Sequence, residues 1–301
     1  MKKKSLKKQL FYLSLVGLPF IQFLLFYCFV NFKSILFAFQ SYDVVEGFAF
    51  NGFENFKQIF IDLTGKNTMK YSLQNSIVLY LWTLLFGTGG AILFSNYIYK
   101  KFFGSKLFQI FLFLPNIISG VVMVTVYKFI LDQGIPLLWR EIFGVQLEPL
   151  LSQKSLKFGL VLGFSLFMGF GTNVLMYTST MSGISPSVVE SAELDGITPF
   201  KELIYITLPM IFPTFVTFIT VGVATIFTNQ MSLYTFYGAD VPSDMYTFGY
   251  LLYKEVKQAT DIMDYETFTY MSALGILLPI IAVPLTLGIK KFLEKFGPSA
   301  D

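Results

Sequence analysis

Six long apolar runs limit what this chain can fold into more than any other feature. They lie near residues 11–32, 73–98, 107–131, 158–181, 208–228 and 269–289. Each is close to the roughly 20 residues that an α-helix needs to cross a bilayer. Backbone groups in lipid must be satisfied within their own segment, and the runs are too continuous for barrel strands. The sequence therefore predicts an all-α integral membrane protein, a six-helix transmembrane bundle forming one domain over residues 1–301.

The composition agrees with a lipid environment for most of the 301 residues. Apolar residues make up 54% of the chain and charged residues 14%, against about 25% charged residues in soluble domains. The formal net charge is +3, and the lysines gather beside the ends of apolar runs, so no nucleic-acid partner is expected. Histidine is absent and Cys28 is the only cysteine, which excludes an intrachain disulfide and a Cys/His metal site.

The first apolar run follows a lysine-rich head and could be mistaken for a secretory signal peptide. From Phe11 to Val30 it is longer than the roughly 7 to 15 residues of a signal core. No small-x-small cleavage site follows it. We therefore expect a retained signal-anchor helix.

The positions of the lysines predict the orientation in the membrane. If the N-terminus lies inside, the short inner segments are basic and the long outer segments, near 33–72, 132–157 and 229–268, hold fewer basic residues. The lysines assigned to the inner side are Lys2, Lys3, Lys4, Lys7, Lys8, Lys100, Lys101, Lys106, Lys201, Lys290, Lys291 and Lys295. Both termini are therefore expected in the cytoplasm.

Prolines and glycines interrupt several of the predicted spans. The glycines are Gly87, Gly89, Gly90, Gly169 and Gly171, and the prolines are Pro19, Pro115, Pro209, Pro213, Pro279 and Pro284. Such residues occur where membrane helices bend around a pathway, and small residues also allow close helix packing. The sequence leaves both interpretations open.

Residues 185–208, which we call the elbow, have the signals of two short helices joined by a turn. Ser185 is a candidate N-cap with Pro186 at the first helical position, and Gly196 is a helix stop. Thr198 and Pro199 repeat the start signal. The elbow is too polar to span a membrane and too apolar to be a free linker, which favours docking on another protein. An interfacial helix on lipid headgroups is the alternative, but such helices are usually cationic and this one is rich in acids.

The elbow resembles the hallmark segment of the permeases of binding-protein-dependent ABC importers. That segment reads Glu-Ala-Ala, three residues, Gly, and then Ile-x-Leu-Pro about nine residues later. This chain has Glu190-Ser191-Ala192, then Gly196, then Ile206-Thr207-Leu208-Pro209. The one departure is Ser191, which replaces a small residue with another small residue.

The resemblance implies a type I importer permease fold in which the elbow is a coupling helix seated in a cleft of a cytoplasmic ATPase. The residues expected to couple to the ATPase are Glu190, Ser191, Ala192, Asp195, Gly196, Phe200, Leu208 and Pro209. The chain has no Gly-x-x-x-x-Gly-Lys-Ser/Thr loop, so it is expected to be a transport subunit and not an enzyme. ATP and Mg²⁺ would bind the partner ATPase, and this chain would bind no cofactor.

Weaker similarities favour the carbohydrate branch of these permeases, of the maltose and oligosaccharide type. They are Phe50-Asn-Gly52-Phe-Glu-Asn55-Phe56, Leu114-Pro115-Asn-Ile-Ile-Ser119 and the Phe296-Gly297-Pro298 tail. The implied assembly contains a second permease subunit, as a heterodimer, two ATPase subunits and an extracytoplasmic solute-binding protein, in a bacterial inner or plasma membrane. Import of a non-sugar solute stays open, because other permeases share the elbow.

Polar faces of two spans are the candidate contacts for a sugar. In the fourth span they are Gly169, Thr172 and Asn173, with Tyr177 one turn further on; in the fifth they are Gly222, Thr225 and Asn229. Helical spacing places each set on one face, where hydroxyl and amide groups could bond a sugar. Interhelical hydrogen bonds that hold the bundle are the alternative.

Two other classes of membrane protein are less consistent with the residues. A secondary transporter driven by an ion gradient needs charged groups near the middle of its spans, and these spans hold almost none. A membrane-embedded enzyme usually needs histidine, paired aspartates or a set of metal ligands, and this chain has no histidine.

Overall fold

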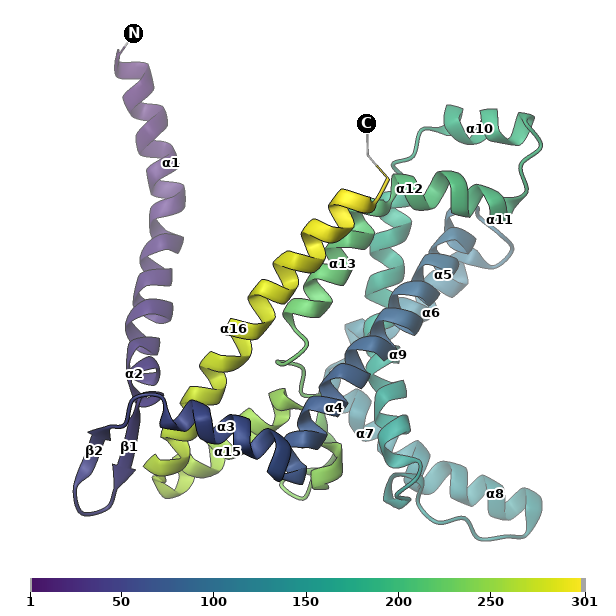
Figure 1. Cartoon of the computed structure of the whole chain (residues 1–301). Coiled ribbons are helices and arrows are strands. Elements are labelled where there is room, and N and C mark those ends of the chain that lie inside the picture. Colours follow the sequence, from purple (N-terminus) through teal and green to yellow (C-terminus); the bar gives the residue numbers. More distant parts are fainter. Residues whose placement is uncertain (1, 299–301) are drawn as a thin grey trace. The chain divides into compact units, whose positions relative to one another are not determined.

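The computed structural model describes residues 2–298 and is mostly helical (Figure 1). The chain ends of the predicted domain, 1 and 299–301, lie outside the described residues, as do the side chains of Lys2, Lys3, Lys4 and Lys7 from the predicted orientation signal. The chain divides into two compact units, which we describe separately. Unit 1 contains 1–66 and 252–280, and unit 2 contains 67–251 and 281–301.

Unit 1 begins with a long helix and contains the only two strands among the described residues. Its elements are α1 (Lys2–Gln22), η1 (Phe23–Phe29), α2 (Val30–Phe37), β1 (Gln40–Asp43), β2 (Gly47–Phe50) and α3 (Glu54–Gly65), with parts of α15 (Phe248–Ile262) and α16 (Tyr265–Phe296). The strands pair antiparallel, Gln40 opposite Phe50. This hairpin is a small departure from the predicted all-α fold.

The motif 50–56 has a structural role in unit 1. Asn55 Nδ2 donates hydrogen bonds to the carbonyl oxygens of Ala38, at 3.1 Å, and Gln40, at 2.8 Å. Gly52 adopts φ +64°, in the left-handed region that favours glycine. The motif therefore ties the start of α3 to the end of α2 and the hairpin.

Asp62 joins α3 to α16 within unit 1. Its carboxylate accepts hydrogen bonds from Lys66 Nζ at 2.7 Å, Tyr270 Oη at 2.7 Å and Gln58 Nε2 at 2.9 Å. Burial opposes the charge of this carboxylate, but its three donors outweigh burial and hold the pKa of Asp62 below its usual value. Asp62 therefore stays ionised at neutral pH, and the stability it contributes is lost only as the pH falls through that lowered pKa.

Unit 2 contains the remaining helices. They are α4 (Asn67–Trp82), η2 (Thr83–Gly89), α5 (Gly90–Tyr99), α6 (Ser105–Ile117), α7 (Gly120–Phe129), η3 (Ile130–Gly134), α8 (Ile135–Phe143), η4 (Leu150–Ser152), α9 (Lys157–Met181), α10 (Pro186–Leu194), α11 (Pro199–Glu202), η5 (Leu203–Thr207), α12 (Leu208–Met210), α13 (Phe212–Ala224), α14 (Leu233–Tyr237) and η6 (Ser243–Met245). Segment η2 and segment η5 are π-helical turns that continue the helices beside them.

Helix α9 is the central element of unit 2, because both α5 and α6 pack against it. Buried Ser95 of α5 donates a hydrogen bond from Oγ to the carbonyl oxygen of Val174, at 2.8 Å. A Cβ atom at Gly171 would overlap the backbone carbonyl of Leu112 on α6, whereas one at Gly169 would meet nothing within 4 Å. Close helix packing therefore explains Gly171 but not Gly169.

Five helical segments of the described chain are long and apolar enough to cross a membrane. They are Leu10–Phe37, Asn67–Tyr99, Gly120–Phe143, Lys157–Met181 and Tyr265–Phe296. Counting the bent pair Pro199–Met210 and Phe212–Ala224 as one span gives six. The chain is thus a multi-pass membrane protein, as the apolar runs predicted.

The third predicted span, 107–131, is not one continuous helix. Helix α6 ends at Ile117, and Ile118 and Ser119 adopt extended ψ angles of 142° and 133° before α7 begins. Pro115 lacks an N–H group and disfavours the helical conformation of the residue before it, which weakens this end of α6. The long apolar segment that follows instead runs from Gly120 to Phe143.

The fifth predicted span, 208–228, is shorter and more bent than its hydropathy indicated. The helix axis turns by 71° between Met210 and Phe212. Pro209 and Pro213 flank this bend, and each removes a backbone donor and crowds the preceding turn. The helix then ends at Ala224, so the expected helical spacing from Gly222 to Asn229 is wrong beyond that residue.

Candidate functional site

The elbow has the shape that its sequence predicted. Helix α10 begins at Pro186, the turn follows Leu194, and α11 begins at Pro199. Figure 1 shows α10 and the arm formed by α11, η5 and α12 as two short helices joined by this turn. Gly196 adopts φ +76°, a backbone conformation that costs other residues about 1–2 kcal/mol. The choice of glycine is therefore explained by the turn itself.

The expected capping bond at Ser185 is absent from α10. Ser185 does occupy the N-cap position, but its Oγ lies 2.8 Å from Ser187 Oγ and not on a backbone N–H group. Thr198 likewise precedes α11 without a side-chain cap. The prolines at the first helical position, with φ already fixed for a helix, are what mark both starts.

Most of the predicted coupling residues lie on the surface. Glu190, Ser191, Asp195, Gly196 and Phe200 are exposed, Leu208 and Pro209 are half-buried, and Ala192 is buried. Leu194, with 89% of its surface exposed, and Tyr205, with 70%, extend the apolar part of this surface beside Phe200. Exposed acids beside large apolar side chains form a surface that suits a protein partner.

Lys100 fastens both arms of the elbow to the end of α5. Its Nζ lies 2.7 Å from Glu202 Oε1 on α11 and donates a hydrogen bond to Glu193 Oε1 on α10, at 3.4 Å. Burial alone would lower the pKa of Lys100, but the two carboxylates outweigh it and raise that pKa. Stability from this pairing is complete below the usual lysine pKa and is lost as the pH rises through the raised value, so Lys100 is charged at neutral pH.

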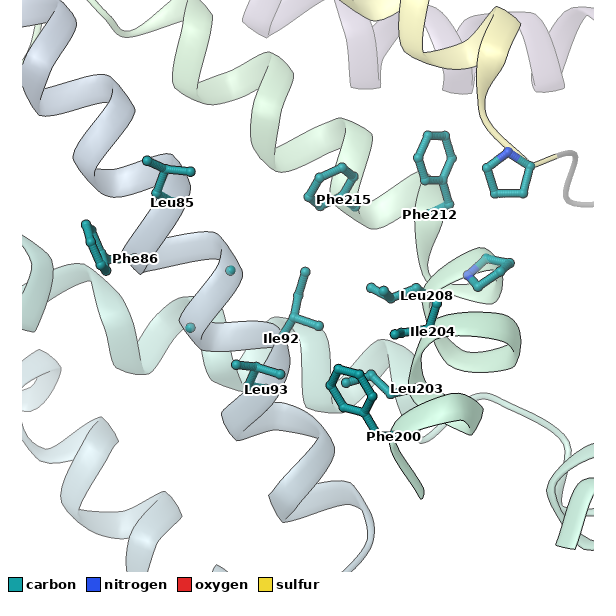
Figure 2. A pocket seen from close by; sticks show the side chains of 14 residues that line it. Leu85, Phe86, Ile92, Leu93, Phe200, Leu203, Ile204, Leu208, Phe212 and Phe215 are labelled. Atoms are coloured by element: carbon teal, nitrogen blue, oxygen red, sulfur yellow. The ribbon is translucent and has the colours of Figure 1, made fainter. Parts of the chain in front are cut away.

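An apolar cavity of about 810 Å³ lies between η2 and α5 on one side and the second arm of the elbow and α13 on the other (Figure 2). Figure 2 shows Ile92 and Leu93 on one side and Leu203 and Leu208 on the other, with Phe200 near its edge. Leu203 also belongs to the buried core that joins α5, α9 and the elbow. The apolar packing between elbow and α5 is therefore incomplete at this point.

The predicted sugar contacts of the fourth span lie on α9. Gly169 and Thr172 are exposed and Asn173 is half-buried, whereas Tyr177 is buried and packs against Phe218 with ring centroids 4.9 Å apart. Thr172 Oγ1 donates a hydrogen bond to Asn116 Oδ1, at 3.0 Å. Thr172 thus has a neighbour on α6 with which it could present two polar groups together.

The predicted contacts of the fifth span are separated by the end of α13. Gly222 is inside the helix, where a Cβ atom would come within 3.0 Å of the Tyr80 ring. Thr225 and Asn229 follow the helix and are exposed, and Asn229 Oδ1 accepts a hydrogen bond from the backbone of Met231. The sequence therefore located a polar segment correctly but assigned it the wrong geometry.

Sequence reasoning missed two lysines that make long-range ion pairs in unit 2, Lys100 at the end of α5 and Lys157 at the start of α9. Lys100 was expected only as an orientation signal, yet it pairs with acids 93 and 102 positions away, a separation at which no local spacing indicates contact. Lys157 was not singled out, and its Nζ lies 2.7 Å from Asp244 Oδ1. The only sequence signal for such a pairing was that the elbow is rich in acids and poor in basic residues, so a lysine that neutralises them must lie in another segment.

The elbow presents exposed acids and large apolar side chains. Within residues 2–298 no three Cys, Asp or Glu side chains are placed to hold a metal ion.

Comparison with known proteins finds relatives among transport proteins. No family model matches the chain. It is 29% identical over 169 residues to a probable ABC transporter permease of Mycoplasma pneumoniae, covering 54% of this chain and 51% of that relative. The chain thus matches about half the length of the first relatives. It is 22% identical to the arabinooligosaccharide permease AraP of Bacillus subtilis, over 89% of this chain and 84% of AraP.

A further relative and the solved structures extend the comparison. The glycerol-3-phosphate permease UgpA of Yersinia pestis is 23% identical over 82% of this chain and 81% of UgpA. A bacterial alginate ABC transporter in complex with a periplasmic protein carrying an alginate pentasaccharide contains a chain with a TM-score of 0.77, at 20% identity, covering 97% of this chain and 96% of that one. The fold is therefore that of an ABC importer permease.

Fold and relatives agree on a class of similar proteins, the membrane-embedded permease subunits of ABC transporters. The relatives are named as ABC transporter permeases and include sugar permeases, which is the family that the elbow motif resembles.

Proposed function

We propose that this chain is a permease subunit of an ATP-driven importer that moves a sugar or oligosaccharide delivered by an extracytoplasmic binding protein. The observation that carries the proposal is the exposed elbow, in which residues resembling the permease motif lie on two short helices joined by a turn. Sugar permeases among the relatives support the substrate class.

In this proposal the chain forms a six-span bundle in a bacterial plasma membrane with both termini in the cytoplasm. It pairs with a second, different permease, and two ATPase subunits bind ATP and Mg²⁺ below them. The exposed elbow face, including Glu190 and Phe200, seats in an ATPase cleft. Closure of the ATPases on ATP moves the elbows and opens the bundle outward, which requires the ATPase to bind the two states of the elbow unequally.

The proposed solute contacts are the polar groups of α9 and of the segment after α13. They are Gly169, Thr172, Asn173, Gly222, Thr225 and Asn229. Helix α13 ends at Ala224, within a predicted span; the N–H of Thr225 still bonds to Val221, and the backbone is irregular by Asn229. Irregular backbone at membrane depth is tolerated where it is buried in protein or lines a watery cavity. A lined pathway would give these polar groups access to a sugar.

One relative favours a second solute class. UgpA is named as a permease for sn-glycerol-3-phosphate, so a small phosphorylated polyol is the alternative cargo. Competition assays with the purified importer in liposomes would separate these cases, because a sugar importer should be inhibited by unlabelled sugars and not by glycerol phosphate.

The coupling role is tested by charge reversal at Glu190. This side chain is exposed, so Glu190→Lys should leave the chain inserted and folded while removing contact with the ATPase. We expect ATP hydrolysis stimulated by the binding protein to be lost in the assembled complex. Glu148→Lys is the matched control, since Glu148 is also exposed and lies in the loop before α9, away from the elbow. Normal stimulation in Glu190→Lys would remove the coupling assignment.

A further inference from the structure

Lys100 does not behave as a simple surface lysine at the end of a helix. It occupies the C-cap of α5, where a lysine ordinarily extends into water and complements the helix dipole. Here only 16% of its side chain is exposed. Lys101, the next residue, is exposed. The side chain of Lys100 has therefore been drawn onto a specific set of neighbours.

Those neighbours come from both arms of the elbow. Glu193 lies near the end of α10 and keeps 61% of its side chain exposed, whereas Glu202 at the end of α11 is 3% exposed. A carboxylate as buried as Glu202 needs a paired charge. Its ion-pair partner in the structure is Lys100, so one lysine fixes the position of both arms relative to α5.

Apolar contacts alone leave this junction loosely defined. Ile98 of α5, Leu203 of the elbow and Ile211 just beyond the elbow share one buried core. The 810 Å³ cavity of Figure 2 opens beside that core, between the same two elements. Apolar packing is non-directional, and a cavity removes part of the packing that would fix the contact. The ion pairs are the directional part of the junction.

We propose that Lys100 is the positioning residue through which displacement of the elbow is transmitted to α5, and from there to the span Asn67–Tyr99. The inference rests on the proposed function, since it requires an ATPase to move the elbow. With the clamp of Lys100, Glu193 and Glu202 intact, the two arms and α5 move as one body. Without it, the elbow can rock across the cavity and leave α5 behind.

The test compares basal and stimulated ATP hydrolysis in the full complex of both permeases, the ATPases and the solute-bound binding protein. Lys100→Met should lower stimulation by the binding protein at least about fivefold, the lower end of typical coupling between sites, with basal hydrolysis unchanged. Lys100→Arg, which keeps the charge, should retain stimulation. Lys101→Met removes a neighbouring exposed charge and should have no effect.

A double variant separates transmission from simple neutralisation of a buried charge. Lys100→Met leaves Glu202 buried without a partner, whereas Lys100→Met combined with Glu202→Gln leaves no buried charge. We expect the double variant to assemble as the unmodified complex does and still to lack stimulation. Restored stimulation in the double variant would overturn the proposal, as would full stimulation in Lys100→Met.

The result also distinguishes this inference from the function on which it rests. If the unmodified chain fails to assemble with an ATPase or shows no stimulation, the proposed function is wrong. If the unmodified complex is stimulated and Lys100→Met is stimulated equally, the importer stands and only the role of Lys100 is wrong.

Discussion

The two ends of α9 are held in different ways. At 25 residues the helix is about 37 Å long, and within unit 2 the elbow follows one end while Lys157 begins the other. The elbow that follows one end is tied to α5 by Lys100 and keeps a large exposed surface. The opposite end is closed by a dense set of bonds among its own segments.

Those bonds center on the segment before α15. Asn75 Nδ2 donates hydrogen bonds to the carbonyl oxygens of Asp244 and Tyr246, both at 2.9 Å. Ser76 Oγ accepts one from the backbone N–H of Phe248, at 3.1 Å, and Lys157 pairs with Asp244. Residues 245–251 are all buried.

The difference shows where a partner could act on unit 2. Residues 245–251 are buried and bonded to α4, so they offer a partner little surface. The elbow keeps exposed acids and large apolar side chains, and a single clamp is easier to move as a body than a distributed network. Stability and coupling should therefore be separable by mutation.

The largest expected effect is a loss of stability on disturbing the packing of α6 against α9, the helix that joins the two ends. Gly171→Ala would force a Cβ atom into the backbone carbonyl of Leu112, so α6 and α9 must separate. We expect a loss of about 3 kcal/mol or more of stability, the upper part of the range for overpacking. Thermal unfolding of the purified chain in detergent would measure it.

Gly169→Ala is the matched control for that substitution. It changes the same residue type on the same helix, but the added atom would meet nothing within 4 Å. Equal melting temperatures for the two variants would contradict the packing of α6 against α9.

A smaller effect is expected from Lys157→Met at the end opposite the elbow. Breaking a buried ion pair costs about 3–5 kcal/mol, but a third of the Asp244 side chain is exposed, so screening should reduce the loss to about 2 kcal/mol. Stimulated ATP hydrolysis in the surviving complex should be normal. Lys154→Met, at an exposed neighbouring lysine, should change neither quantity.

This variant and Lys100→Met form a reciprocal pair. Lys157→Met should lower stability and leave stimulated ATP hydrolysis normal. Lys100→Met should lower stimulated ATP hydrolysis while the complex still assembles. A loss of coupling in Lys157→Met as large as that in Lys100→Met would show that the two ends of α9 do not differ in the way described.

The sequence predicted the membrane spans and the elbow because both depend on local signals. Apolar length alone predicts a span, and Pro186, Gly196 and Pro199 mark helix starts and a left-handed turn wherever they occur. The break after Ile117 and the end of α13 at Ala224 were missed, since the hydropathy does not change at either point.

The clamp and the opposite closure could not be predicted from the sequence. Asn75 and Tyr246 are 171 positions apart, and Lys100 and Glu202 are 102 apart. Such pairs are created by tertiary packing around α9, and spacing rules for helices reach only three or four residues. The sequence located the acids of the elbow but not the lysine that binds them.

The most direct test of the account is the side of the membrane on which the elbow lies. Ser191 is exposed on α10, and Cys28 is the only cysteine, so Ser191→Cys in a Cys28→Ser background carries one label site. A maleimide that cannot cross the membrane should label it in inside-out vesicles and not in intact cells, with an ATPase subunit protecting it in the assembled complex. Labelling from the outside of intact cells would contradict the account.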